Sequence, residues 1–276
     1  MSGIGYIKVE HKAGLSVLAE CSFQYPLKLI SPNPQSEAIC VYMLSYGGGL
    51  VSGDDIALTA HIGQNCNVCF LTQGSTKVFK EQAGRGPARQ NMKCNIGPHA
   101  VFVLLPDPVV PFRESSYIQK QRFYLDDTAS VLVLDWLTEG RSAYAEHWSF
   151  RQFATCNEIF RGTRLLVRDA TRLEDQGGGR IQDRMNSCVC SATILVHGPK
   201  FDSFCEDLQN LYDNEDRVRG GSRVGPLWAV SRVRDCTIIK AASNKVEELR
   251  EKIYEILRLG CILENIFGTV IFQSSK

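Results

Sequence analysis

Short runs of alternating hydrophobic and polar residues dominate the first two hundred positions. In residues 55–63 the apolar side chains recur at every second position, the pattern of a strand with one buried face. Similar runs, separated by Gly, Pro, Asn and Asp, occur at residues 15–23, 39–44, 67–72, 101–105, 117–125, 131–134, 148–153 and 191–196. Many short strands with few helices between them predict a mainly β protein, built as a sandwich, a barrel or a β-helix.

The C-terminal third of the chain predicts two α-helices. The first begins just after Pro199 and has apolar residues at helical spacing, namely Phe201, Phe204, Cys205, Leu208, Leu211 and Tyr212. The second has a stronger apolar face, formed by Val246, Leu249, Ile253, Ile256 and Leu257. Asn244 with Glu247 three residues later resembles a helix cap, and Gly260 is suited to end this helix.

No shift in composition marks a linker, so residues 1–276 are expected to form a single domain. The polar, glycine-bearing stretches 175–184 and 213–223 are interpreted as surface loops within it. The chain has 31 Lys and Arg against 30 Asp and Glu, which leaves no surplus charge to attract nucleic acid or anionic lipid over the whole surface. The N-terminus lacks an apolar signal region, and the densest apolar runs are much shorter than the ~18 residues that span a membrane. A cytoplasmic protein with no nucleic-acid or membrane partner is therefore expected.

The cysteines are numerous but do not predict disulfides. Their number, eleven, is odd, their spacing is irregular and no secretory signal precedes them. Cys66 and Cys69 lie three apart in a predicted strand, so their side chains face opposite sides. Cys188 and Cys190 share one predicted strand face, a better geometry for a soft metal, but their neighbours are apolar. Reduced thiols that pack as small core residues are favoured for both pairs.

The glycine-rich segment GGGLVSGD, residues 47–54, does not have the spacing of a phosphate-binding loop. No Lys-Ser or Lys-Thr follows its last glycine, and the next segment predicts a strand rather than a helix. A tight turn between strands is the simpler interpretation. No nucleophile stands beside a base, and the histidines lie far apart. The chain has many carboxylates, and the sequence pairs no two of them as acid and base; the set is Asp54, Asp55, Asp107, Asp135, Glu139 and Glu146.

The order of several motifs along the chain resembles the UreD (UreH) family of urease accessory proteins, in its eukaryotic-like branch. The glycine turn is followed by TQGSTKVF at 72–79, then PDP at 106–108 with PF at 111–112. Asp135-Trp136, Gly140-Arg141 and Glu146 complete the succession. Two positions depart from the family pattern. Ser52 replaces a frequent glycine and makes the turn less permissive, and Phe79 replaces a frequent tyrosine and so lacks its hydroxyl.

The resemblance implies a β-helix-like stack of short strands with two α-helices in the C-terminal third. It also implies that the chain is not an enzyme but a scaffold or metallochaperone for nickel insertion into apo-urease. The implied partners are apo-urease, a helical UreF-type protein and a UreG-type GTPase, and nickel is the transient cofactor. The absence of a local thiolate or imidazole cage agrees with a protein that passes nickel on and therefore holds it weakly.

The resemblance also selects the candidate site residues. Asp54, Asp135 and Glu146 are predicted as successive weak oxygen ligands for nickel, whereas Lys77 and Arg141 hold these carboxylates and offset their repulsion. Gly48, Gly49 and Gly53 form the motif turn. In the simpler alternative, Asp54 only closes a turn and Arg141 only forms a structural ion pair with Glu146.

Two other functions stay open at this point. One is a pure assembly scaffold in the same complex that never contacts nickel. The other is a β-helical or β-sandwich carbohydrate-active hydrolase that uses two of the carboxylates, although such enzymes are usually secreted.

Overall fold

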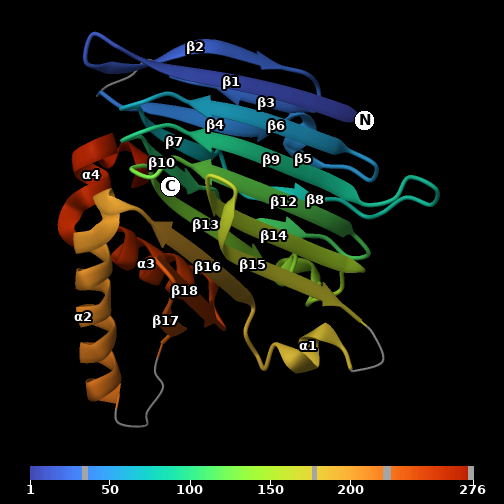
Figure 1. Ribbon diagram of the computed structural model, residues 1–276. Helices are drawn as coiled ribbons and strands as arrows, with labels where there is room; N and C mark the ends of the chain where they lie inside the picture. Colours follow the sequence, from blue (N-terminus) through green and yellow to red (C-terminus); the bar gives the residue numbers. More distant parts are fainter. Residues whose placement is uncertain (33–36, 176–178, 220–224, 273–276) are drawn as a thin grey trace.

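Successive coils of the chain build the molecule, and corresponding strands of each coil lie side by side in parallel. The computed structural model describes residues 1–32, 37–175, 179–219 and 225–272. Three coils each contribute one strand to a first sheet, one short strand to a narrow ladder and one strand to a second sheet. A further coil crosses between the two sheets through a loop in place of the short strand. Figure 1 shows the resulting stack, which confirms a mainly β, β-helix-like fold.

The first sheet, here called sheet A, has seven strands. In spatial order they are β15 (Arg164–Glu174), β14 (Gln152–Arg161), β12 (Ser116–Leu125), β9 (Ala88–Ile96), β6 (Asp55–Ile62), β1 (Ser2–Lys12) and β2 (Leu15–Phe23). The strands from β14 to β1 pair in parallel, and the two edge strands pair antiparallel.

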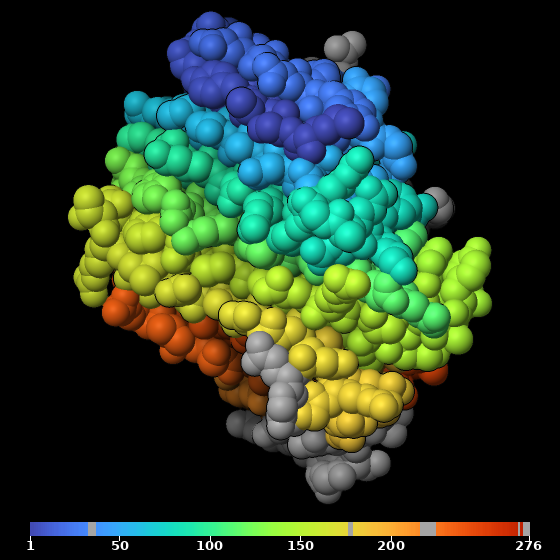
Figure 2. Space-filling view, turned by 90° about the vertical axis from the view of Figure 1, so that its right-hand side faces the viewer, coloured from blue at the N-terminus to red at the C-terminus, as the bar shows by residue number. Residues whose placement is uncertain are grey.

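The second sheet, here called sheet B, contains β17 (Leu227–Val233), β18 (Cys236–Ser243), β16 (Cys190–His197), β13 (Ser130–Thr138), β10 (Val101–Leu105), β7 (Asn67–Thr72), β4 (Ile39–Ser45) and β3 (Leu27–Ile30). The narrow ladder joins β5 (Gly49–Leu50), β8 (Thr76–Val78) and β11 (Val109–Pro111). Chain order follows the stack, from the blue N-terminal strands to the orange and red C-terminal segments in Figure 2.

Three of the described α-helices, α2 (Asp202–Arg219), α3 (Val246–Leu257) and α4 (Ile262–Phe267), cover the outer face of sheet B, whereas the outer face of sheet A is open in Figure 1. The remaining described α-helix is α1 (Ile181–Arg184). The two predicted helices are confirmed as α2 and α3. The short 3-10 turns are η1 (Tyr46–Gly48), η2 (Ser142–Tyr144), η3 (Pro199–Phe201), η4 (Leu259–Cys261) and η5 (Thr269–Phe272). Among the described helices, none is both long and apolar enough to cross a membrane.

Two hydrophobic cores explain the strand sequences. One lies between the sheets and the other lies between sheet B and the helices, so a strand of sheet B is apolar on both faces. Phe102 faces the first core and Val103 the second, which accounts for the continuous apolar run of β10. Cys66 and Cys69 divide between the same two cores, as their spacing predicts, and both are fully buried.

Several predicted boundaries are wrong. Residues 213–219 belong to α2 rather than to a loop, and residues 220–223 of that stretch lie outside the described residues. In the stretch 175–184, α1 occupies the end, and residues 176–178 are likewise not described. The strand predicted at 148–153 begins only at Gln152, because Trp148 has a positive φ of 49° that a strand does not accept. Helix α3 is capped by Lys245 without a side-chain bond, not by Asn244.

Candidate functional site

The motif segments separated along the sequence are stacked on the narrow ladder. Gly49 of β5 pairs with Lys77 of β8, and Lys77 pairs in turn with Val110 of β11. The glycine turn and the TQGSTKVF segment therefore occupy the same place on neighbouring coils. Motifs that follow one another in the sequence therefore lie side by side and form one surface in the structure.

Close backbone approach requires glycine in the turn. A Cβ atom on Gly49 would lie 2.6 Å from the Lys77 carbonyl oxygen and 2.7 Å from the Phe79 ring. Gly48 and Gly53 have φ angles of 73° and 78°, in the left-handed region that glycine adopts without strain. Ser52 is not among the residues with positive φ, and its hydroxyl donates to the Gly86 carbonyl at 2.8 Å. Serine therefore does not strain the turn.

Asp54 makes the contacts of a residue that closes a turn. Its side chain is buried, and one carboxylate oxygen accepts the Val51 backbone N–H at 2.9 Å. Its own N–H donates to the Val51 carbonyl at 3.0 Å, and its carbonyl accepts the Arg89 N–H at 2.7 Å. The second carboxylate oxygen lies 3.3 Å from the Met1 amino group. These bonds hold the turn that leads from β5 into β6.

Arg141 and Glu146 form a two-pronged ion pair in the loop between β13 and β14. The Arg141 Nε and Nη2 atoms donate to the two carboxylate oxygens at 2.9 and 2.5 Å. Glu146 is buried, and the bond from Arg141 lowers the pKa of this carboxyl below its ordinary value. The guanidinium also lies over the Phe112 ring at 3.9 Å, and Phe112 meets Phe79 edge to face at 5.2 Å. An aromatic and cationic column thus links three coils.

Asp135 points from β13 into the space between the sheets. Its carboxylate accepts the Asn157 amide at 2.7 Å and the Gln119 amide at 3.4 Å. Burial raises the pKa of Asp135, against the effect of these hydrogen bonds. The carboxylate borders a cavity of about 20 Å³, room for roughly one water molecule, whose lining also includes Asp107 and Gln121.

Oxygen atoms without partners distinguish this interior. Among the described residues, the side-chain oxygens Oε1 of Gln121 and Oδ1 of Asn157 are buried and accept no hydrogen bond. Gln119 Oε1 accepts the Tyr117 hydroxyl at 2.7 Å. Buried polar atoms without a partner are costly, so this set of carboxylate and amide oxygens is suited to receive a water molecule or a cation.

Asp107 lies near the point where the interior approaches the motif surface. It accepts the Gly74 N–H at 2.9 Å and the Thr72 hydroxyl at 3.3 Å, and burial raises its pKa. Thr72 and Thr76 border the interior cavity and also a surface hollow of about 320 Å³ beside the glycine turn. The described side chains thus connect the motif surface to the neighbourhood of Asp135.

The structure brings some predicted site residues together and separates others. Arg141 and Glu146 are in contact, and Lys77 is exposed beside Gly49. Asp54 is bonded to Val51 and Met1, and Glu146 to Arg141 and the Arg113 backbone N–H, so neither carboxylate faces Asp135. Asp135 alone of the predicted residues lines the interior cavity. Within the described ranges, no group of three or more His, Cys, Asp or Glu side chains is placed to hold a metal ion.

Sequence reasoning missed the polar side chains that surround Asp135, of which Gln119 and Asn157 bond to it. Tyr117, Gln119 and Gln121 occupy the inward positions of β12, which continue into the buried Phe123 and Leu125. Polar residues at positions that the alternation assigns to the core are the signal that identifies such an interior.

Comparisons with known proteins agree in one family. A family model described as UreD urease accessory protein matches residues 2–269. A Schizosaccharomyces pombe protein, named an uncharacterized urease accessory protein ureD-like, is 34% identical over 91% of this chain and 92% of its own length. Urease accessory protein UreD of Sorangium cellulosum is 36% identical over 87% and 79%. Urease accessory protein D of Oryza sativa subsp. indica is 35% identical over 75% and 68%.

Proposed function

Because the chain belongs to the UreD urease accessory protein family, we propose that it acts as a non-enzymatic scaffold and metallochaperone for nickel insertion into apo-urease. In this proposal it works in the cytoplasm, in a complex with a UreF-type helical protein and a UreG-type GTPase. Nickel is its cargo rather than a resident cofactor. The names of the relatives, which describe accessory proteins, support the non-catalytic part of the proposal.

The polar interior around Asp135 is the observation that supports passage of nickel through this chain. Its donors are carboxylate, amide and hydroxyl oxygens, and a borderline cation such as Ni²⁺ binds these less tightly than several thiolates or imidazoles. Weak binding suits a cargo that must leave again. The unpartnered oxygen of Gln121, which lines the same cavity, would replace part of the hydration shell.

The candidate residues then have different roles. Asp135 is the proposed interior ligand, with Asp107 nearer the motif surface. Asp54 holds the glycine turn through its bonds to Val51, and the Arg141–Glu146 pair holds the loop between β13 and β14. In this proposal, any direct contact of Asp54 or Glu146 with nickel occurs before nickel reaches Asp135 or after nickel leaves it. Lys77, exposed on the same surface, is proposed to contact a partner there.

An Asp135→Asn variant tests the interior step. It keeps the size of the side chain and removes the negative charge. We expect urease activation to require about tenfold more nickel, the lower end of the usual effect when a metal's ligand environment is altered. Asp127→Asn is the matched control, because this exposed carboxylate lies in the turn after β12 and outside the cavity. Co-purification with apo-urease must be unchanged in both variants.

A pure assembly scaffold is the second candidate, and one observation favours it. Asp54, Arg141 and Glu146 all have structural partners, which is sufficient to explain their presence without nickel. If Asp135→Asn and Asp54→Asn both join the urease complex and load nickel normally when nickel is limiting, this candidate replaces the transit proposal. The hydrolase alternative is not favoured, since the family match spans residues 2–269.

A further inference from the structure

The outer face of sheet A divides into two halves of different charge. On β9, β12 and β15 the outward side chains include six cations, which we call the basic face: Arg89, Lys93, Lys120, Arg122, Arg168 and Arg172. On β9, β12, β14 and β15, all of which the structure describes, the outward carboxylates are Glu158 and Glu174. On the other half of the sheet, Lys8 and Lys12 are balanced by the carboxylates Glu10, Glu20 and Asp55, and Asp55 lies beside Arg89 at the border of the two halves. A chain with near-zero net charge thus concentrates positive charge on one surface.

Strand register places the cations of the basic face in neighbouring rows. Lys93 lies beside Arg122, Arg122 beside Glu158, and Glu158 beside Arg168. Neighbouring strands are about 4.8 Å apart, and residues two apart on a strand are separated by roughly 6.7 Å. The cations therefore form a grid whose spacing matches side chains projecting from an extended segment.

Glu158 shows how this face holds a carboxylate. Arg122 Nε lies 3.0 Å from one of its oxygens and Lys120 Nζ lies 3.6 Å from the same oxygen. Arg168 Nε lies 3.6 Å from the other oxygen. One carboxylate among three cations leaves positive charge uncompensated, and Arg122 and Arg168 are 44% and 59% exposed. Further carboxylates are the complementary ligands.

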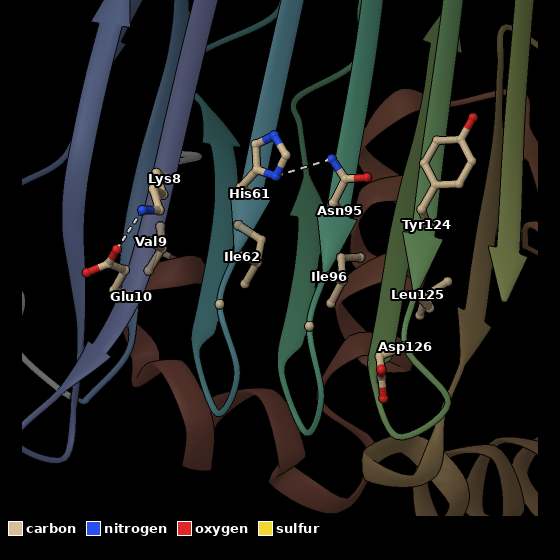
Figure 3. A pocket seen from close by; sticks show the side chains of 12 residues that line it. Lys8, Val9, Glu10, His61, Ile62, Asn95, Ile96, Tyr124, Leu125 and Asp126 are labelled. Atoms are coloured by element: carbon tan, nitrogen blue, oxygen red, sulfur yellow. Dashed lines mark hydrogen bonds and ion pairs between the residues drawn. The ribbon is translucent and has the colours of Figure 1, made fainter. Parts of the chain in front are cut away.

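The aromatic residues beside the basic face do not offer a platform for nucleic-acid bases. Tyr124 and Phe160 stack on each other, with ring centroids 4.9 Å apart and planes 14° apart, and Lys93 lies 5.3 Å from the Tyr124 ring centroid. Base stacking needs a free aromatic face. Figure 3 shows a hollow beside the basic face, at the C-terminal ends of the strands. Its lining includes one residue from each of four neighbouring strands: Lys8, His61, Asn95 and Tyr124.

We propose that the basic face of sheet A docks an acidic segment of a partner protein. The cationic grid and the carboxylate already bound among Lys120, Arg122 and Arg168 support an acidic polypeptide. None of the described helices covers this side of the sheet in Figure 1, which leaves the basic face accessible. The inference rests on the proposed function only in taking the partner to be a protein. Docking here leaves the motif surface on the narrow ladder free.

The test uses the full chain and a fluorescein-labelled oligoglutamate peptide, with binding followed by fluorescence anisotropy. The variant Arg89→Gln/Lys93→Gln/Arg168→Gln removes three cations but leaves Lys120 and Arg122 to pair with Glu158. We expect this variant to bind the peptide about tenfold more weakly than the unmodified chain. The control Lys8→Gln/Lys12→Gln/Lys80→Gln changes the net charge equally and should bind like the unmodified chain. Raising the salt concentration should weaken binding to the unmodified chain more steeply than binding to the variant.

Three outcomes overturn the proposal: no saturable peptide binding, equal loss in the control, or tighter binding of an oligouridylate of equal charge or of phosphatidylserine vesicles. The assay contains neither nickel nor urease. Failure of peptide binding would therefore leave nickel insertion intact, and failure of urease activation by Asp135→Asn would leave this docking surface intact.

Discussion

The inward side chains of β6 and of β12 both fill the space between the two sheets, but one row is apolar and the other is polar at its start. Both strands lie in sheet A and face sheet B, but β6 presents Ile56, Leu58, Ala60 and Ile62. The start of β12 presents Tyr117, Gln119 and Gln121, opposite Asp135. Since β6 shows that an apolar row satisfies this architecture, the polar row of β12 costs stability that the fold does not require. Its residues are therefore the ones to examine for function.

Phe70→Ala should have the largest effect and would establish the apolar rows as the source of stability. Phe70 is fully buried and contacts Phe102 with ring centroids 5.0 Å apart. We expect a loss of about 3–5 kcal/mol in the free energy of unfolding, measured with urea. Phe160→Ala, a partly exposed position on the outer face of sheet A, is the control. If Phe70→Ala loses no more free energy of unfolding than Phe160→Ala, the apolar rows are not the source of stability.

Arg141→Ala should cost less, about 1–2 kcal/mol, because Glu146 loses its partner while Arg141 is itself 35% exposed. The pKa of Glu146 is lowered in the folded protein, so its stabilisation is present above its ordinary pKa of 4.5 and is lost as pH falls through the lower folded value. The difference between the two proteins should therefore shrink in acid. A pH-independent difference would assign the effect to the lost packing on Phe112 instead.

Asp135→Asn should leave the fold intact and increase the free energy of unfolding at pH 7 by about 1 kcal/mol. The Asn157 amide can rotate to present its unpartnered oxygen to the new side chain. Burial raises the pKa of Asp135, so its contribution to stability falls as pH rises from its ordinary value of 3.8 through the folded value. Urea titrations of both proteins between pH 3 and 7 measure this. A clear loss of stability at pH 7 would show that the polar row serves the fold.

Glu10→Gln should have the smallest effect. The pKa of this carboxyl is lowered to about 2 by its bonds to Lys8 and Lys12, but the side chain lies on the outer face of sheet A and is 33% exposed. Solvent screens such pairs, so we expect no change in the urea midpoint beyond the measurement error. A measurable loss would mean that outer-face charges contribute to stability as the inner rows do.

Strands that the sequence predicted well have apolar side chains at strict alternation or in a continuous run. β6 and β10 are examples, and the order of the motifs identified the family. β9 and β15 were missed because polar residues at inward positions, such as Gln90 and Asp169, interrupt the apolar alternation. Asp135 was found by resemblance, but its amide partners were not, because contacts between two sheets leave no spacing along the chain. Positive φ at Trp148 likewise delayed the start of a predicted strand without any local signal.

The coiled path of the chain has a consequence for how the protein is made. Ile39 pairs with Val68, and Val101 pairs with Ser130, so a strand in these coils meets a neighbour that was synthesised about 30 residues earlier. Pairing at this separation is slow compared with helix formation. A ribosome that adds about 5–20 residues per second gives each coil one or more seconds to settle on the previous one. During synthesis from the N-terminus, each coil can therefore pair with a coil that has already folded. In refolding from denaturant, no folded coil is present at the start.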